Sequence, residues 1–193
     1  MKVSKQKAAE HREKIIKTAA RRFRENGFDG ISVADLMKEA GLTHGGFYGH
    51  FSSKEELMGL ASQRALQDTA AKWKKVIEEA PQKPLEALAK FYLSPKHRAQ
   101  PETGCLFAAL GTELGRQSRS VKEAVTHEQT NILDLLARIV PGKTKAAKDK
   151  QAIVVLAGLV GAMVLARSVP DPVLSEEILK TVSDAIPNCV YRD

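Results

Sequence analysis

Apolar residues recur every three or four positions along most of the chain, which is the spacing of amphipathic α-helices. Between residues 8 and 26 this spacing places five side chains on one face: Ile15, Ile16, Ala19, Ala20 and Phe23. Gly27 then supplies a C-terminal stop. No stretch shows the strict alternation of a half-buried strand. The pattern therefore predicts an all-α protein.

Short-range signals divide the N-terminal quarter into small helices. Ser32, with Asp35 three residues later, resembles a capping box and predicts a helix that runs through Ala40 and ends at Gly41. Thr43 is the candidate cap of the next helix.

That next helix is expected to run to about His50. Ser53 and Glu56 form a second capping box, which predicts a long helix to about Glu79. Prolines and glycines divide the remainder into helices near residues 85–93, 105–117, 120–140, 146–169 and 175–186, with a polar loop over 94–104. We expect a three-helix domain over residues 1–53 and a larger helical domain over residues 54–193.

Composition and charge narrow the class of protein. The 193 residues are 43% hydrophobic and 27% charged, as in an ordinary globular protein, and the two cysteines are far apart, which argues against a disulfide framework or a zinc site. A cytoplasmic protein without a signal peptide is expected. The most apolar stretch, residues 152–166, is about 15 residues long, short of the ~20 that span a bilayer, so we expect a core helix and no membrane partner.

The positive charge is concentrated at the N-terminal end. Residues 1–24 contain nine lysines and arginines against two glutamates, so their local excess equals the net charge of +7 for the whole chain. Such a block is either a solvated face or the electrostatic footprint beside a nucleic-acid site.

The stretch GLTHGGFYGHFSSKEEL, residues 41–57, has the order of a helix-turn-helix. A short helix, a turn at Gly41 and a second short helix match that motif, whose second helix enters the DNA major groove. Gly45, Gly46 and Gly49 each cost this helix roughly 1 kcal/mol relative to Ala. Close approach of the backbone to DNA would explain them. Double-stranded DNA is therefore the expected partner.

Side chains around this second helix have separate expected roles at the DNA. Thr43 and His44, near its start, are the candidates for contact with base edges. Tyr48 and Lys54 are placed to bind phosphates, and His50 completes the candidate DNA-binding set with the glycines. His44 and His50 are six residues apart, a spacing that does not suit two metal ligands on one helical face, so no metal site is expected.

The segment FDGISVADLMKEAGLTHGGFYGHFSSKEEL resembles the DNA-binding domain of the TetR/AcrR family of transcriptional repressors over about residues 10–58. The resemblance implies an all-α homodimer with a DNA-binding head and a ligand-binding body, which represses transcription at a palindromic operator until a small molecule binds. By position it implies DNA contacts from Thr43, His44, Tyr48 and Lys54, and core positions for Phe47 and Phe51. Gly46 and Gly49 depart from the family pattern, so fewer base contacts are expected.

The resemblance also places the dimer interface and the effector pocket. The last two long helices would pair between protomers, although the small residues of the first, among them Ala157, Gly161 and Ala162, also suit packing in a core. Five residues form the candidate effector site: Trp73, Cys105, Phe107, His127 and Met163. Core packing remains an alternative for Trp73, and a surface position for His127.

Cys105 is a candidate reactive cysteine, because it lies at an expected helix N-terminus, where the helix dipole favours a thiolate. A sensor of electrophiles and a plain structural cysteine both remain open. A DNA-binding protein without an effector is the alternative function. No GxSxG, phosphate-binding glycine loop, HExxH or paired-carboxylate motif is present, so neither an enzyme nor a cofactor is expected.

Overall fold

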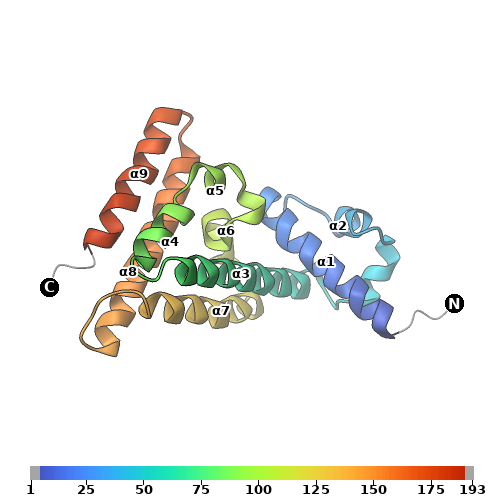
Figure 1. Ribbon diagram of the computed structural model, residues 1–193. Helices are drawn as coiled ribbons and strands as arrows, with labels where there is room; N and C mark the ends of the chain where they lie inside the picture. Colours follow the sequence, from blue (N-terminus) through green and yellow to red (C-terminus); the bar gives the residue numbers. More distant parts are fainter. Residues whose placement is uncertain (1–4, 190–193) are drawn as a thin grey trace.

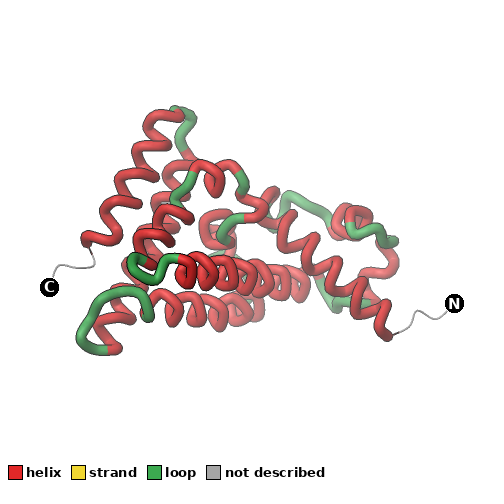
Figure 2. Tube along the Cα trace, viewed as in Figure 1, coloured by secondary structure: helices red, strands yellow, loops and turns green. Residues whose placement is uncertain are grey.

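The computed structural model describes residues 5–189, which form helices joined by short loops (Figures 1 and 2). No strand occurs within these residues, which confirms the all-α prediction. The elements are α1 (Lys5–Asn26), α2 (Val33–Glu39), the 3₁₀-helix η1 (His44–Gly49), α3 (Lys54–Glu79), α4 (Pro84–Tyr92), α5 (Pro95–Ala99), the 3₁₀-helix η2 (Pro101–Thr103), α6 (Leu106–Leu114), α7 (Arg119–Ala137), α8 (Lys145–Ser168) and α9 (Pro172–Cys189).

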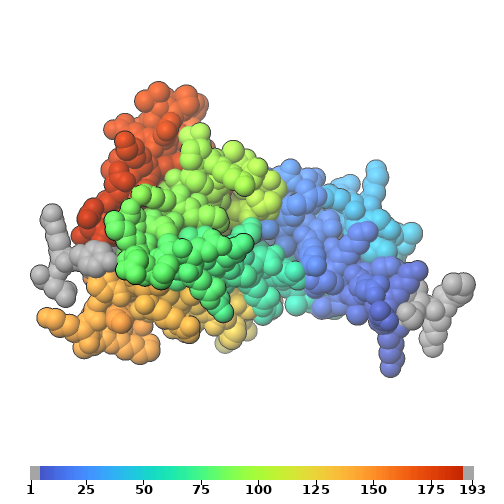
Figure 3. Space-filling view, in the orientation of Figure 1, coloured from blue at the N-terminus to red at the C-terminus, as the bar shows by residue number. Residues whose placement is uncertain are grey.

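The first three elements, α1, α2 and η1, form a lobe at one end of the molecule, which we call the head (Figures 1 and 3). The N-caps predicted by the two capping boxes form: Ser32 caps the start of α2 within the head, and Ser53 caps the start of α3 where the head ends. The hydroxyl of Ser32 accepts the N–H of Asp35 at 3.1 Å, and the hydroxyl of Ser53 accepts the N–H of Glu56 at 3.1 Å. These caps satisfy N–H groups that the first helical turn leaves without partners.

Aromatic packing fills the head. Phe47 and Phe51 are 1% and 2% exposed, with ring centroids 5.4 Å apart, and Phe23 lies 5.2 Å from Phe28. The core positions predicted for Phe47 and Phe51 are confirmed. Burying such rings removes 150–250 Å² each from water, so they dominate the stability of so small a lobe.

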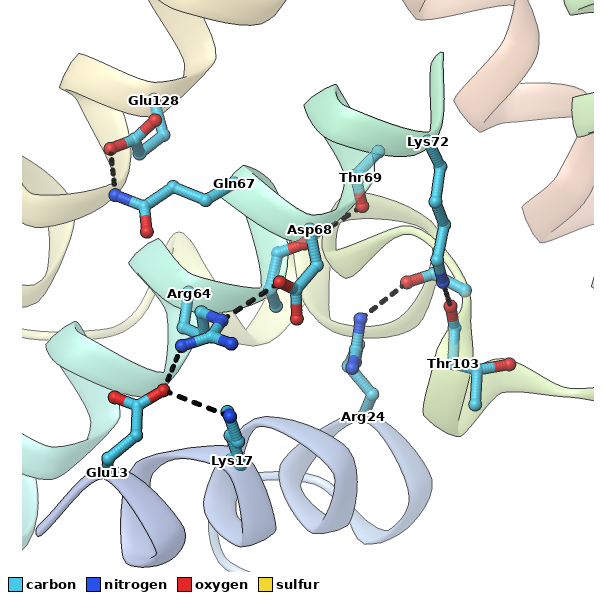
Figure 4. A network of polar contacts seen from close by, with 12 residues as sticks. Glu13, Lys17, Arg24, Arg64, Gln67, Asp68, Thr69, Lys72, Thr103 and Glu128 are labelled. Carbon is cyan, nitrogen blue, oxygen red and sulfur yellow. Dashed lines mark hydrogen bonds and ion pairs between the residues drawn. The ribbon is translucent and has the colours of Figure 1, made fainter. Parts of the chain in front are cut away.

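The long helix α3 connects the head to the rest of the chain, which we call the body. It packs against α1 in the head and runs beside α7 in the body. Glu13 of α1 forms an ion pair with Arg64 of α3 across this contact (Figure 4). The predicted boundary between residues 53 and 54 therefore falls at the start of a helix that both parts share.

Two local expectations are wrong. The predicted polar loop over 94–104 contains α5 and η2, because the Ser94 hydroxyl caps α5 by accepting the N–H of His97 at 3.2 Å. Thr43 occupies the position before η1, but its side chain makes no capping hydrogen bond there.

Helices α8 and α9 pack together at the end of the molecule opposite the head (Figure 1). Thr144 caps α8, whose 24 residues extend well beyond the apolar stretch. By length and composition α8 is long and apolar enough to cross a membrane, but the core helix of a soluble protein passes the same test. One face of α8, including Leu159 and Met163, is fully buried in the body.

Candidate functional site

The helix η1 presents a solvent-exposed face at the tip of the head. It follows α2 through a turn at Gly41, whose φ of +70° lies in the left-handed region that favours glycine. Thr43, His44 and Tyr48 are exposed, and Tyr48 reaches 71% of its maximum. Its ring rests edge-on against buried Phe47, with centroids 5.3 Å apart. The buried phenylalanine thus holds the exposed tyrosine in place.

The glycines of η1 leave this face with little side-chain cover. A Cβ added at Gly45 or Gly49 would meet no atom within 4 Å, and one at Gly46 would make only ordinary contacts, 3.7 Å from the Met37 methyl and the Thr43 hydroxyl. Packing inside the chain therefore does not require glycine at these positions. What they provide is bare backbone at the surface, as close approach of another molecule needs.

The side chains of Lys54 and His50 are more engaged with the rest of the protein than that of Tyr48. The amino group of Lys54 donates a 3.0 Å hydrogen bond to the carbonyl of Ile31, which ties the start of α3 to the head. His50 is half-buried, and its pKa is lowered by burial and by the neighbouring His11 and Arg12. Lys54 thus has a structural contact as well as its predicted role at DNA.

Much of the basic charge of α1 is engaged within the protein. Four cations form ion pairs, Arg12 with Glu56, Lys17 with Glu13, and Arg21 and Arg22 with Glu39. Arg24 is buried and donates to the carbonyl of Gly104 at 2.7 Å. The charge block in the sequence thus overstates the number of cations available to phosphates.

The body contains a pocket of about 520 Å³ between α3, α4 and residues 94–105. This volume suits a small organic molecule. Among the five candidate effector residues, Trp73 and Cys105 line it. Phe107 is half-buried on α6, Met163 lies in the core of α8, and the His127 side chain is 74% exposed on α7; these three lie outside its lining.

Cys105 lies on the pocket wall directly before α6, at the predicted helix start, and is 3% exposed. Its backbone N–H donates to Nε2 of His97 at 2.9 Å, and Nδ1 of His97 lies 2.7 Å from the carbonyl oxygen of Tyr92. This pattern assigns a neutral imidazole with its proton on Nδ1. Burial of His97 lowers its pKa to about 4, which agrees with the neutral form.

Cations from three helices bind backbone carbonyl oxygens of the segment 97–104. Sequence reasoning did not predict these contacts. Arg24 of α1 binds Gly104, Lys72 of α3 binds Thr103 at 2.9 Å, and Arg167 of α8 binds His97 at 2.6 Å and Arg98 at 3.2 Å. Figure 4 shows Arg24 and Lys72 converging on the segment from opposite sides. Single basic residues carry no sequence signal for contacts of this kind.

Sequence comparison relates the chain to known bacterial regulatory proteins. The model of the family described as "Bacterial regulatory proteins, tetR family" matches residues 15–60. The uncharacterized HTH-type transcriptional regulator YerO of Bacillus subtilis (strain 168) is 35% identical over 81 residues, 42% of this chain and 28% of that protein. The HTH-type transcriptional repressor DhaR of Mycobacterium sp. (strain GP1) is 27% identical over 111 residues, 58% of this chain and 56% of that protein. The chain thus spans between about a quarter and a little over half of these relatives.

Solved structures match the fold over nearly the whole chain. The reduced form of E. coli NemR has a TM-score of 0.78 at 20% identity, with 95% of this chain and 100% of that chain covered. A TetR transcriptional regulator from Chloroflexus aurantiacus J-10-fl has a TM-score of 0.77 at 21% identity, with 97% and 98% covered. At this identity the likeness concerns the fold alone.

Proposed function

This chain belongs to the TetR family of bacterial regulatory proteins, and we propose that it is a transcriptional repressor that binds a palindromic DNA operator as a homodimer. The observation that carries the proposal is the exposed face of η1. Thr43, His44 and Tyr48 point to solvent there, above a buried Phe47, on a helix whose glycines leave the backbone bare. Such a surface fits a major groove.

The homodimer is supported by an apolar face at the end opposite the head. Six large apolar side chains of α8 and α9 are at least 42% exposed: Ile153, Val154, Val164, Leu165, Val173 and Leu174. Several large apolar side chains exposed on two packed helices favour an interaction site. Pairing two copies through it would bury the patch and leave both heads free for two half-sites of DNA.

Effector control is supported by the pocket in the body. A ligand that prefers one arrangement of the body shifts the protein toward that arrangement, and repression ends when that arrangement binds the operator less well. The cytoplasm is the proposed location, since the operator lies there in bacteria. A DNA-binding protein that responds to no effector is the alternative, and it predicts operator binding that no pocket ligand weakens.

Modification of Cys105 is a second route to release, favoured by the position of its thiol on the pocket wall. Cys105 is 3% exposed and lines the pocket, so a reagent would reach its thiol through the pocket. Release of wild-type protein from DNA by an alkylating agent, without release of Cys105→Ser, would support this route. Equal release of both proteins would contradict it.

The decisive experiment selects DNA from a random double-stranded pool with the purified chain. Enrichment of a two-fold symmetric sequence, protected from cleavage over two half-sites, is the expected result. Binding without any enriched sequence would overturn the proposed repressor. A triple variant with Gly45, Gly46 and Gly49 changed to Ala serves as a comparison, because these side chains have room in the free protein but would stand between η1 and the groove.

A further inference from the structure

The pocket in the body has an aromatic wall. Trp73 of α3 and Tyr92 of α4 meet edge to face, with ring centroids 5.6 Å apart, and both are almost fully buried. Phe91 also lines the pocket and is 44% exposed. Three rings around one space favour a flat ligand, because offset and edge-on ring contacts add to the burial of apolar area.

The pocket also has a surplus of positive charge. Lys72, Lys75 and Lys96 line it, against the single carboxylate of Glu79, which lies 3.8 Å from Lys75. Among residues 5–189, neither Lys72 nor Lys96 forms an ion pair with a carboxylate. The pKa of Lys72 is lowered first by its partial burial and then by Arg24 and Lys96, with Asp68 acting in the opposite direction. An anion would relieve this repulsion.

A buried hydroxyl on the pocket wall lacks a strong partner. Tyr92 is 1% exposed, and within the described part of the chain its Oη has no close hydrogen-bond partner; the thiol of Cys105, a weak partner, is the polar group that acts on it. Burial raises the pKa of Tyr92 well above its usual value, Cys105 raises it further, and Arg167 acts in the opposite direction. The hydroxyl therefore stays protonated and has a hydrogen to donate. Buried polar groups in folded proteins are nearly always well paired, so a hydroxyl on a pocket wall with only a thiol beside it points to a ligand atom that accepts from it.

Taking the effector-responsive function above as the starting point, we propose that this pocket binds a small aromatic carboxylate that carries an oxygen on its ring. The ring lies against Trp73 and Phe91, the carboxylate pairs with Lys72, and the ring oxygen accepts a hydrogen bond from Tyr92. Arg24 and Arg167 are outside the pocket lining and bind backbone carbonyls, and Lys75 pairs with Glu79, which leaves Lys72 and Lys96 as the cations that can meet an anion there. Lys72 is exposed at the side of the pocket, so it can turn toward a ligand.

The same lysine connects the ligand to the head. The amino group of Lys72 binds the carbonyl of Thr103, and the carbonyl of the next residue, Gly104, binds Arg24 in the last turn of α1 (Figure 4). A carboxylate that pairs with Lys72 competes with the Thr103 carbonyl for the amino group. Ligand binding would thereby weaken the bond from Lys72 to Thr103, the residue next to the Gly104 carbonyl that Arg24 of α1 binds. Helix α1 packs directly against α2 in the head, so the change can reach the head.

The fluorescence of Trp73, the only tryptophan of the chain, reports binding without DNA. The probe is 4-hydroxybenzoate, compared with its neutral analogue 4-hydroxybenzamide and with benzoate, which lacks the ring hydroxyl. We expect 4-hydroxybenzoate to bind at least tenfold more tightly than either. Equal affinity for the acid and the amide, or no binding of the acid at millimolar concentration, would overturn the proposal.

Three variants locate the contacts. Lys72→Met should reduce the affinity for 4-hydroxybenzoate about tenfold, to that of the amide, whereas Lys74→Met, an exposed neighbour on α3 outside the pocket lining, should leave it unchanged. Tyr92→Phe should remove the preference for 4-hydroxybenzoate over benzoate, and it keeps the aromatic ring that packs against Trp73. Equal effects of Lys72→Met and Lys74→Met would contradict the proposed ion pair.

A parallel titration of selected operator DNA separates this proposal from the function on which it rests. Binding of 4-hydroxybenzoate with release of the operator from wild-type protein, but not from Lys72→Met, supports both. Operator binding without any binding of the acid overturns the pocket proposal alone. Binding of the acid by a chain that selects no operator overturns the repressor and leaves the pocket assignment standing.

Discussion

The carboxylate of Glu113 in α6 accepts a 2.8 Å hydrogen bond from the backbone N–H of Phe28, just after the end of α1. This bond joins body to head across 85 residues of sequence. Gly27 lies beside it with a φ of +80°, and a Cβ there would come within 3.0 Å of the same carboxylate. The joint thus depends on one acidic side chain and on one position without a side chain.

Loss of the Glu113 carboxylate should weaken this joint. Glu113→Ala leaves the N–H of buried Phe28 without its acceptor, which costs about 1–3 kcal/mol of unfolding free energy. Glu113→Gln keeps an oxygen that can accept and should cost less. Urea denaturation measures both. Equal unfolding free energies for wild type and Glu113→Ala would show that the bond contributes nothing.

Acid should destabilise the protein through His97. The pKa of His97 is about 4 in the folded chain and about 6.5 when unfolded, so between these values the unfolded state binds the additional proton. The unfolding free energy therefore falls as pH is lowered from about 6.5 to about 4, by at most about 1.4 kcal/mol per pH unit from this group.

His97→Gln removes this titration, so its unfolding free energy should change less over that pH range than that of wild type. His44→Gln, an exposed histidine on η1, is the matched control and should follow wild type. Chemical denaturation at several pH values makes the comparison. Parallel pH profiles for wild type and His97→Gln would contradict the assigned neutral imidazole.

Two substitutions in the head should separate base contacts from phosphate contacts. His44→Ala should change the ranking of operator variants, because His44 is proposed to contact base edges. Lys54→Ala should keep the ranking and reduce the slope of log affinity against log salt by about 0.9, the share of one phosphate. Titrations at several salt concentrations measure both effects. An unchanged ranking with His44→Ala would assign base contacts to other residues.

The proposed dimer face is tested by neighbouring residues of α8. A Cβ at Gly161 would meet nothing within 4 Å, so Gly161→Arg fits the protomer and should produce a folded monomer in sedimentation velocity. Ala162 is 3% exposed, and Ala162→Arg should instead unfold the body. Gly111→Arg, at an equally open glycine of α6, should remain dimeric. An intact dimer with Gly161→Arg would exclude this face.

Features that depend on neighbouring residues in sequence were predictable. The caps at Ser32 and Ser53 involve a hydroxyl and an N–H three residues away, so a short pattern contains both partners. The inward position of Phe47 was implied by the family resemblance, which rests on a short continuous segment. The 3₁₀ geometry of η1 was not predicted, because helix type over six glycine-rich residues is decided by packing.

Features that depend on distant residues were not predictable. The bond from Arg24 to Gly104 spans 80 positions, and nothing in either residue type announces it. Trp73 and Cys105 meet at one pocket while Phe107 and Met163 face elsewhere, because the angles between helices decide which sides face one another. The number of free cations on α1 was overestimated from the sequence for a related reason. Their acidic partners, such as Glu39 and Glu56, come from other helices.

The composition of η1 also limits how much sequence information the protein can extract from DNA. Three of its six residues are glycine and one is the buried Phe47, which leaves His44 and Tyr48, with Thr43 just before them, to face a groove. Since each side chain distinguishes about one base pair, a half-site defined this way will occur by chance many times in a bacterial genome. The distance between two half-sites and the number of copies of the protein in the cell would then decide which genes it controls.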